Sequence, residues 1–127
     1  MTIKIENVLT NNIIEISSHI GKTKAICFHV NLQTGKTYGV EFNINSFIKL
    51  GENATKVYSN SCFISYDGNL SQIQGLCEDV DEFGTLWFRL AEDCLIALET
   101  EDKDIHAGDY LQIEVAPQLL EMFIIGV

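Results

Sequence analysis

Basic residues are scarce in this chain. Its 127 residues include eight lysines and arginines against eighteen aspartates and glutamates, which gives a formal net charge of −10 at neutral pH. Nucleic-acid binding depends on clusters of Lys and Arg that neutralise phosphates, and an anionic membrane surface makes the same demand. The composition therefore predicts that the protein binds neither nucleic acid nor an anionic membrane.

Long apolar runs are absent as well. No window approaches the roughly 20 consecutive apolar residues of a membrane-spanning helix. The N-terminal residues 1–6 lack the apolar core and the cleavage site of a signal peptide. Apolar residues make up 46 % of the chain and charged residues 20 %, which is typical of a globular protein. We expect a single cytoplasmic domain that spans residues 1–127.

The chain also lacks the residue spacings of common metal and phosphate sites. It has no Cys-x-x-Cys or His-x-x-x-His pair and no phosphate-cradling glycine loop. Residues 79–84 begin like an EF-hand loop, but Leu90 occupies the position where the loop needs a bidentate glutamate. This excludes an EF-hand and leaves a weak surface calcium site open. No cofactor is predicted.

The four cysteines, Cys27, Cys62, Cys77 and Cys94, lie far apart in apolar segments. In the cytosol we expect reduced, buried thiols, whereas disulfides are the alternative for an exported protein. Cys27 and His29 share one face of an expected strand, which could aim a thiol at an imidazole. A nucleophilic site also needs an orienting group and an oxyanion hole. We therefore expect a buried cysteine beside a half-exposed histidine, and no enzymatic activity.

Alternating apolar residues predict strands in the second half of the chain. Residues 85–90 place Leu86 and Phe88 on one face, with polar or aromatic residues on the other, and residues 110–115 repeat this pattern. Between them, Cys94–Leu98 is nearly continuous in apolar residues, which predicts a central strand that is buried on both faces. Turn-forming residues separate these strands.

The remaining segments are also predicted to be strands separated by turns. The exceptions are one expected helical turn at Phe47–Leu50 and a bulge at Gly75. Met122–Ile125 is apolar on both faces, which predicts that this end packs centrally. About nine strands without a strand–helix–strand rhythm indicate an all-β, mainly antiparallel fold, either a β-sandwich or a partly open β-barrel with at most one short helix. The other strands are expected at residues 2–8, 13–17, 23–32, 37–44, 55–66 (in two pieces) and 70–80, with turns at 10–12, 19–22, 33–36 and 67–69.

The acidic residues are distributed unevenly. Residues 1–74 hold five acidic residues and six lysines, a net charge of +1, whereas residues 75–127 carry a net charge of −11. Such a run is either a solvated surface that aids solubility or a binding face for something basic, since packed like charges repel one another. The second segment holds Arg89 and Lys103 against thirteen acids: Glu78, Asp79, Asp81, Glu82, Glu92, Asp93, Glu99, Glu101, Asp102, Asp104, Asp109, Glu114 and Glu121.

Trp87, Arg89 and Tyr110 fall on the polar side of their predicted strands. These three residue types are enriched at binding hot spots, so an aromatic pair framed by carboxylates could bind a basic protein or a sugar. If both faces of the sheet are covered, Trp87 instead belongs to the core. The sequence leaves both alternatives open.

In its size, its charge and its acidic segment 78–104, the chain resembles the small acidic immunity proteins of bacterial toxin–immunity pairs of the contact-dependent inhibition type. The resemblance implies a protein partner with a basic, phosphate-binding cleft, such as a nuclease toxin, which acidic residues would attract and aromatic residues would anchor. The predicted partner-binding residues are Asp79, Asp81, Glu82, Trp87, Arg89, Glu101, Asp102, Asp104 and Tyr110.

Two other functions are compatible with the sequence. A small-ligand or sugar-binding β-domain would use aromatic residues flanked by carboxylates. A structural or interaction module would self-associate through the apolar C-terminal strand to form a homo-oligomer. A shift in stability with added ligand would indicate the first alternative, and a solution mass above 14.2 kDa the second.

Overall fold

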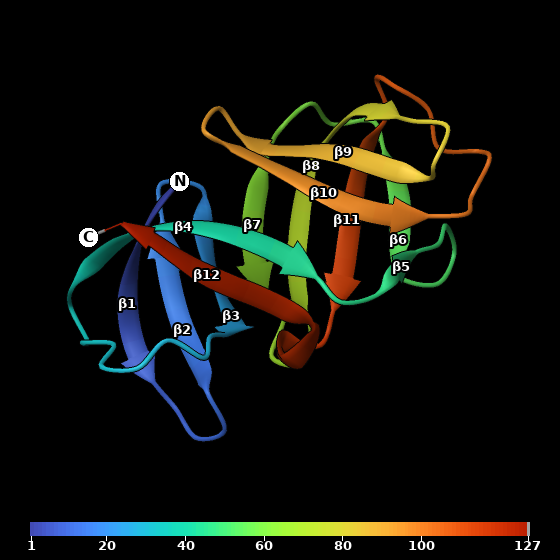
Figure 1. The fold of residues 1–127 in the computed structure, drawn as a ribbon. Coiled ribbons are helices and arrows are strands. Elements are labelled where there is room, and N and C mark those ends of the chain that lie inside the picture. Colours follow the sequence, from blue (N-terminus) through green and yellow to red (C-terminus); the bar gives the residue numbers. More distant parts are fainter. Residues whose placement is uncertain (127) are drawn as a thin grey trace.

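The computed structural model describes residues 1–126 and confirms the predicted all-β fold (Figure 1). It has twelve strands, more than the nine expected, and no α-helix among the described residues. No helix in this part of the chain is long and apolar enough to cross a membrane. The elements are β1 (Thr2–Val8), β2 (Ile13–Ser18), β3 (Gly21–Ile26), β4 (Thr37–Ile44), β5 (Phe47–Ile48), β6 (Ala54–Val57), β7 (Phe63–Tyr66), β8 (Ser71–Val80), β9 (Thr85–Ala91), β10 (Cys94–Thr100), β11 (Tyr110–Val115), the 3-10 helix η1 (Pro117–Leu119) and β12 (Leu120–Gly126).

Five strands close into a small barrel in the order β12-β4-β1-β2-β3 (Figure 1, left). Antiparallel pairing joins β1 to β2 and β4, β2 to β3, and β4 to β12. A parallel bridge between Ile26 of β3 and Glu121 of β12 completes the ring. The closure leaves few free strand edges in this half of the molecule.

The other strands continue the same sheet. A parallel bridge between Gly21 and Ile64 joins β3 to β7, and antiparallel pairing leads on through β8 and β9 to β10. On its other edge β8 pairs with β11, which pairs in turn with β6. This second curved region holds most of the acidic segment (Figure 1, right).

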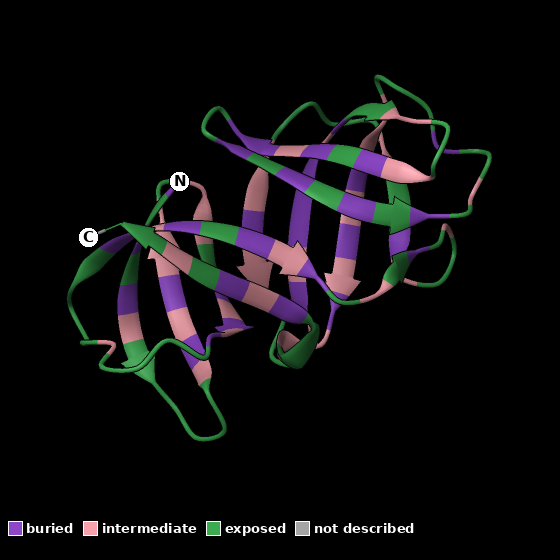
Figure 2. Ribbon diagram, in the orientation of Figure 1, coloured by how far each residue is buried: buried purple, intermediate pink, exposed green. Residues whose placement is uncertain are grey.

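Strand β10 corrects one prediction about burial. Its residues alternate strictly between buried and exposed, as the banding in Figure 2 shows, and Leu95 is 43 % exposed. The prediction that Cys94–Leu98 is buried on both faces is therefore wrong. Only the inner face of β10 packs into the core, which includes Phe88 and Leu111.

The predicted helical turn at Phe47–Leu50 is also wrong, because Phe47–Ile48 is an extended strand that pairs in parallel with the end of β10. Side chains hold the extended backbone in place. The Asn53 amide donates to the Phe47 carbonyl (2.8 Å), and the buried Thr100 hydroxyl donates to the Ile48 carbonyl (2.7 Å). These two bonds outweigh the weak local preference of a four-residue apolar segment for a helical turn.

The strand expected at residues 23–32 ends at Ile26, and residues 33–36 do not form a hairpin between neighbouring strands. The chain instead crosses the barrel so that β4 pairs with β1 and β12. Beyond Ile26 the apolar residues Phe28 and Val30 are exposed, so their alternation does not mark a sheet face. The turns at residues 10–12 and 67–69 connect paired strands as predicted. The connection predicted at residues 19–22 is shorter, because Gly21 and Lys22 already belong to β3.

Two smaller predictions need correction. The irregularity in β8 lies between Cys77 and Asp79 rather than at Gly75. Gly75 is buried because the Phe88 ring and the Arg89 carbonyl occupy the space next to its Cα. In β12, Phe123 and Ile125 are exposed, so the segment is buried on one face only.

Candidate functional site

Strand pairing brings Tyr110, Arg89 and Leu95 into one row on the outer side of the sheet. Leu76 of β8 is the cross-strand neighbour of both Tyr110 in β11 and Arg89 in β9. Arg89 is in turn the neighbour of Leu95 in β10. Neighbouring strands lie about 4.8 Å apart, so these side chains follow one another directly across four strands.

Trp87 belongs to the next row and is 36 % exposed, so the alternative that it is part of the core is wrong. Its cross-strand neighbours are Asp79 and Ala97. The indole Nε1 donates a hydrogen bond to Asp81 Oδ2 (3.4 Å). Because Trp87 and Arg89 are two residues apart on one strand, they lie about 7 Å from each other on the same face.

A third row extends this surface to Phe47, which is 44 % exposed and pairs with Glu99. A shallow concavity of about 290 Å³ lies beside Phe47, and Ala97 and Glu99 line it. We call the surface formed by the three rows the outer face. It consists of Phe47, Leu76, Trp87, Arg89, Leu95, Ala97, Glu99 and Tyr110.

Arg89 is held in a fixed position on the outer face. Its Nε and Nη2 donate to the two carboxylate oxygens of Glu78 (2.8 and 3.4 Å), and its Nη1 donates to the Glu92 carbonyl (3.1 Å). The hydrogen bond from Arg89 lowers the pKa of the Glu78 carboxyl. The guanidinium therefore presents a fixed planar surface whose charge Glu78 largely balances.

Two acidic loops, residues 81–84 and 101–109, meet beside the start of β9 and the end of β10 (Figure 1, right). The Thr100 amide donates to the Gly84 carbonyl (2.9 Å) and ties the loops together. Between them is a concavity of about 200 Å³, and its lining includes Asp81, Glu101 and Asp102. The structure therefore gathers carboxylates that lie about twenty positions apart in the sequence.

Asp81 and Asp102 have structural roles within these loops. Asp81 Oδ1 accepts hydrogen bonds from the amides of Phe83 (2.9 Å) and Thr85 (3.0 Å), and the Thr85 bond is the main cause of its lowered pKa. Asp102 accepts from the amides of Asp104 (3.0 Å) and Leu50 (3.1 Å), and these bonds lower its pKa as well. Both carboxylates shape the loops and are less free to meet a partner than the sequence suggested.

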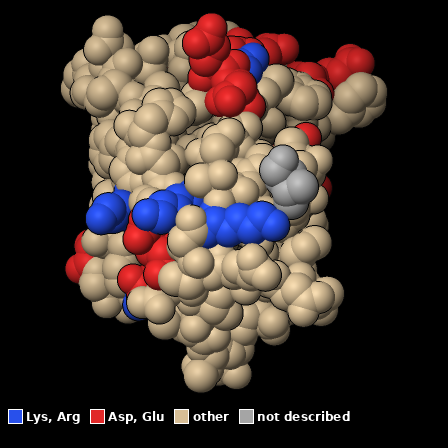
Figure 3. All heavy atoms as spheres, turned by 90° about the vertical axis from the view of Figure 1, so that its left-hand side faces the viewer, with Lys and Arg blue, Asp and Glu red and all other residues tan. Residues whose placement is uncertain are grey.

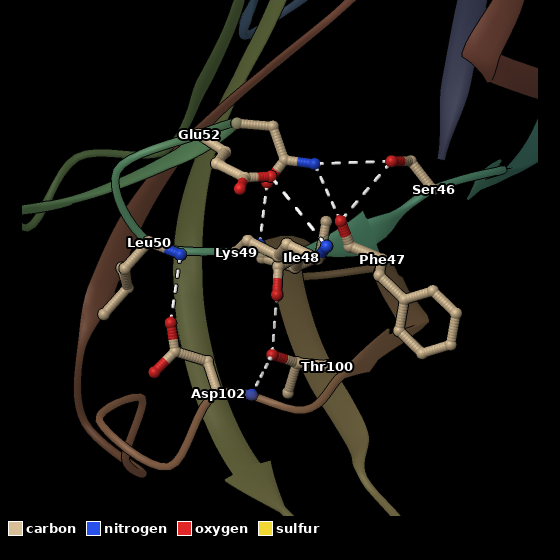
Figure 4. Close-up of polar contacts among 9 residues, drawn as sticks. Ser46, Phe47, Ile48, Lys49, Leu50, Glu52, Thr100 and Asp102 are labelled. Atoms are coloured by element: carbon tan, nitrogen blue, oxygen red, sulfur yellow. Dashed lines mark hydrogen bonds and ion pairs between the residues drawn. The ribbon is translucent and has the colours of Figure 1, made fainter.

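Figure 4 shows how the second loop is anchored to the segment that carries Phe47. Asp102 receives the Leu50 amide, while the Thr100 hydroxyl accepts from the Asp102 amide (3.0 Å) and donates to the Ile48 carbonyl. The acidic loop and the aromatic end of the outer face are thus held by one hydrogen-bond network.

Four of the predicted acidic residues make no side-chain hydrogen bond or ion pair with any residue from 1 to 126. All four are exposed, and they extend along the rim of the outer face and over the two loops. Because no ion pair within residues 1–126 neutralises them, they are the groups best placed to attract a basic partner. They are Asp79, Glu82, Glu101 and Asp104.

Replacing Thr100 with valine is expected to lower the free energy of unfolding by about 2 kcal/mol, because the buried Ile48 carbonyl loses its donor. Chemical denaturation of Thr100→Val measures this loss. The matched control is Thr55→Val, the same change at an exposed position of β6, which should alter stability little. Equal stabilities of the two variants would contradict the anchoring role of Thr100.

The four cysteines are free thiols, and three of them are buried, whereas Cys62 is partly exposed. Burial raises the pKa of the Cys77 and Cys94 thiols to about 11, so both stay protonated near neutral pH. Burial also raises the pKa of Cys27, while His29 is exposed beyond the end of β3. Within residues 1–126 no group of three or more His, Cys, Asp or Glu side chains is arranged to hold a metal ion.

The sequence interpretation missed Phe47, Leu95 and Ala97 as members of the outer face. Leu95 and Ala97 lay in an apolar run that we expected to be buried throughout, and Phe47 lay in the expected helical turn. Glu99 was the available signal, since a charged residue in register with Leu95 and Ala97 indicates that this side of β10 is open to solvent.

Comparisons of the chain with protein-family models, with curated proteins and with solved structures found no match.

Proposed function

We propose that this protein is a binding protein of the immunity type, which neutralises a basic, nuclease-type toxin through the outer face and the two acidic loops. The observation that carries the proposal is the position of exposed Trp87 on the outer face, among apolar and charged side chains and next to the acidic loop that holds Asp81. Aromatic and arginine side chains at the centre of a surface with a polar rim are the usual composition of a protein-binding site.

The exposed apolar side chains of the outer face favour a surface that binds a protein over one that only aids solubility. Phe47, Trp87 and Leu95 are all large and exposed, and the strand pairings place them in adjacent rows. A patch of large exposed apolar side chains with charged residues among and around them is typical of an interaction surface. A solvated acidic surface would serve solubility without such a patch.

The charges of the two loops define the chemistry of the partner. Residues 81–84 and 101–109 contain six acidic residues and one lysine. A nuclease binds phosphates in a cleft rich in Lys and Arg, so its active region complements this rim. Complementary charges raise association rates by about 10–10³-fold, and fast capture is valuable when the partner is toxic to the cell that makes the inhibitor.

The test is a double charge reversal at two exposed acids that make no side-chain bonds, Glu82→Lys together with Asp104→Lys. Because the loops keep Asp81 and Asp102, they should retain their shape. The rate constant for association with the partner, measured by stopped-flow at low salt, should fall by about tenfold or more. The dissociation rate should change less, since steering acts before contact.

The control is Glu15→Lys together with Glu41→Lys, which makes the same change in net charge on the barrel half. It should reduce the association rate much less than the loop variant. Equal reductions would mean that only the net charge matters, and unchanged rates in both variants would remove the acidic loops from recognition.

A further inference from the structure

A polar groove runs along the outside of the barrel, on the opposite half of the molecule from the acidic loops. Two concavities of about 420 and 340 Å³ adjoin there, and both are lined by Lys24 of β3 and Tyr66 of β7. The two concavities therefore lie side by side with Lys24 and Tyr66 between them, and we call them together the groove. The first part is also lined by Glu6, Asn7, Glu15 and Lys22, and the second by Ile13, Asn69, Leu70 and Ala116–Gln118.

Strand register sets hydrogen-bonding side chains in line across this groove. Asn7 of β1 pairs with Glu15 of β2, which pairs with Lys24 of β3. The Lys24 Nζ lies 4.7 Å from the centre of the Tyr66 ring, so the line ends on an aromatic side chain. In this line the Glu15 carboxylate, an acceptor, lies between two donors, the Asn7 amide and the Lys24 ammonium group.

The neighbouring row adds groups of both charge signs. Lys4 pairs with Ser17, and Ser17 pairs with Lys22, while the Ser17 hydroxyl donates to the Glu6 carboxylate. The hydrogen bond from Ser17 lowers the pKa of Glu6, which keeps this carboxylate ionised. Figure 3 shows a row of basic side chains across this side of the molecule, with acidic side chains directly next to it.

Charge balance in the groove limits the class of ligand. Its lining holds two lysines and two glutamates. An anionic chain would meet the glutamates and a cationic chain the lysines, and either would carry an unfavourable like-charge contact. An uncharged ligand with many hydroxyl groups avoids both contacts, since each hydroxyl can donate to a carboxylate or accept from an ammonium group.

We propose that this groove binds a neutral oligosaccharide that lies across Lys24 and Tyr66, with sugar units in both parts of the groove. Glu15 and Lys24 bond to its hydroxyl groups, and the Tyr66 side chain contacts an apolar face of a sugar ring. The volumes of the two parts fall within the range of small-molecule sites. This site is independent of the acidic loops and of the proposed toxin partner.

The test is NMR titration of the whole protein with neutral trisaccharides, namely cellotriose, maltotriose and triacetylchitotriose. Trigalacturonate, the glucosamine trimer and triglycine serve as anionic, cationic and zwitterionic probes. At least one neutral trisaccharide should shift the resonances of Glu15, Lys24 and Tyr66. Glu15→Gln and Lys24→Met should each weaken its binding by about tenfold, because each removes a bond to a charged group.

Lys36→Met is the matched control, since it removes a surface lysine that lines neither part of the groove, and it should leave the affinity unchanged. Three results would overturn the proposal. They are no shift with any neutral trisaccharide, tighter binding of a charged or zwitterionic probe, and shifts that map outside the groove. A failure to bind in the groove says nothing about toxin binding at the outer face, so this proposal and the toxin-binding proposal fail separately.

Discussion

Replacing Trp87 with alanine is expected to weaken binding of the protein partner by about 30-fold or more. Central aromatic residues of an interface commonly contribute at least about 2 kcal/mol when truncated, which corresponds to this change in affinity. Trp87 lies in the middle row of the outer face, next to Ala97 and one row from Leu95. Calorimetric titration of the variant with the partner measures the loss.

The control is Phe28→Ala, which removes a more exposed aromatic side chain (61 %) from the barrel half. It should leave the affinity unchanged. The thermal midpoint of Trp87→Ala should stay close to that of the wild type, because the indole is already partly exposed and makes one long hydrogen bond. Equal affinities of the Trp87 and Phe28 variants would show that the outer face is not the binding surface.

Replacing Gly75 with alanine is expected to cost about 3 kcal/mol of stability, near the upper end for overpacking in a core. A Cβ atom there would lie 2.4 Å from the Arg89 carbonyl oxygen and 2.8 Å from Cζ of the buried Phe88 ring. Neither can move freely, because the carbonyl belongs to the adjacent strand and the ring is fully buried. Urea denaturation gives the size of the loss.

Gly39→Ala provides the control, since its Cβ would meet its nearest neighbours at 3.7 Å, an ordinary contact distance. This variant should be nearly as stable as the wild type. If no folded Gly75→Ala protein accumulates while Gly39→Ala folds normally, the loss of stability is in the expected direction and larger than the value of about 3 kcal/mol expected above. Similar stability of both variants would contradict the close packing of β8 against β9.

The sequence predicted the fold class because side-chain alternation in the strands is a local property. Residues 85–90 and 110–115 alternate as expected, and their apolar sides are buried in the structure. The order of the strands was not predictable in this way. Pairing of β1 with β4 and β12 with β4 joins segments far apart in the chain, and no local pattern specifies such contacts.

Burial on the second face of a strand also depends on tertiary structure. The apolar run Cys94–Leu98 suggested cover on both sides, but no element within residues 1–126 covers the side that carries Leu95 and Ala97. The positions of Trp87 and Arg89 on the polar side of β9 were predicted correctly, because that prediction needed only the period of the strand.

The roles of the acidic residues were also only partly predictable from the sequence. The uneven distribution of charge is visible in the sequence, yet the structure assigns Asp81 and Asp102 to loop hydrogen bonds. Part of this assignment could have been predicted from the sequence, since the aspartate side chain commonly accepts a hydrogen bond from the backbone amide two residues further along the chain. The bond from Leu50 to Asp102 spans 52 residues, and it required the three-dimensional structure.

Capture of a partner from the source cells tests the central claim most directly. The tagged protein is incubated with a lysate, and bound proteins are identified after washing at low and at high salt. We expect one basic protein in stoichiometric amount at low salt, with a nuclease activity that is blocked while this chain is bound. Recovery of no basic protein at low salt, or of one whose activity is unchanged in the complex, would contradict the proposed function.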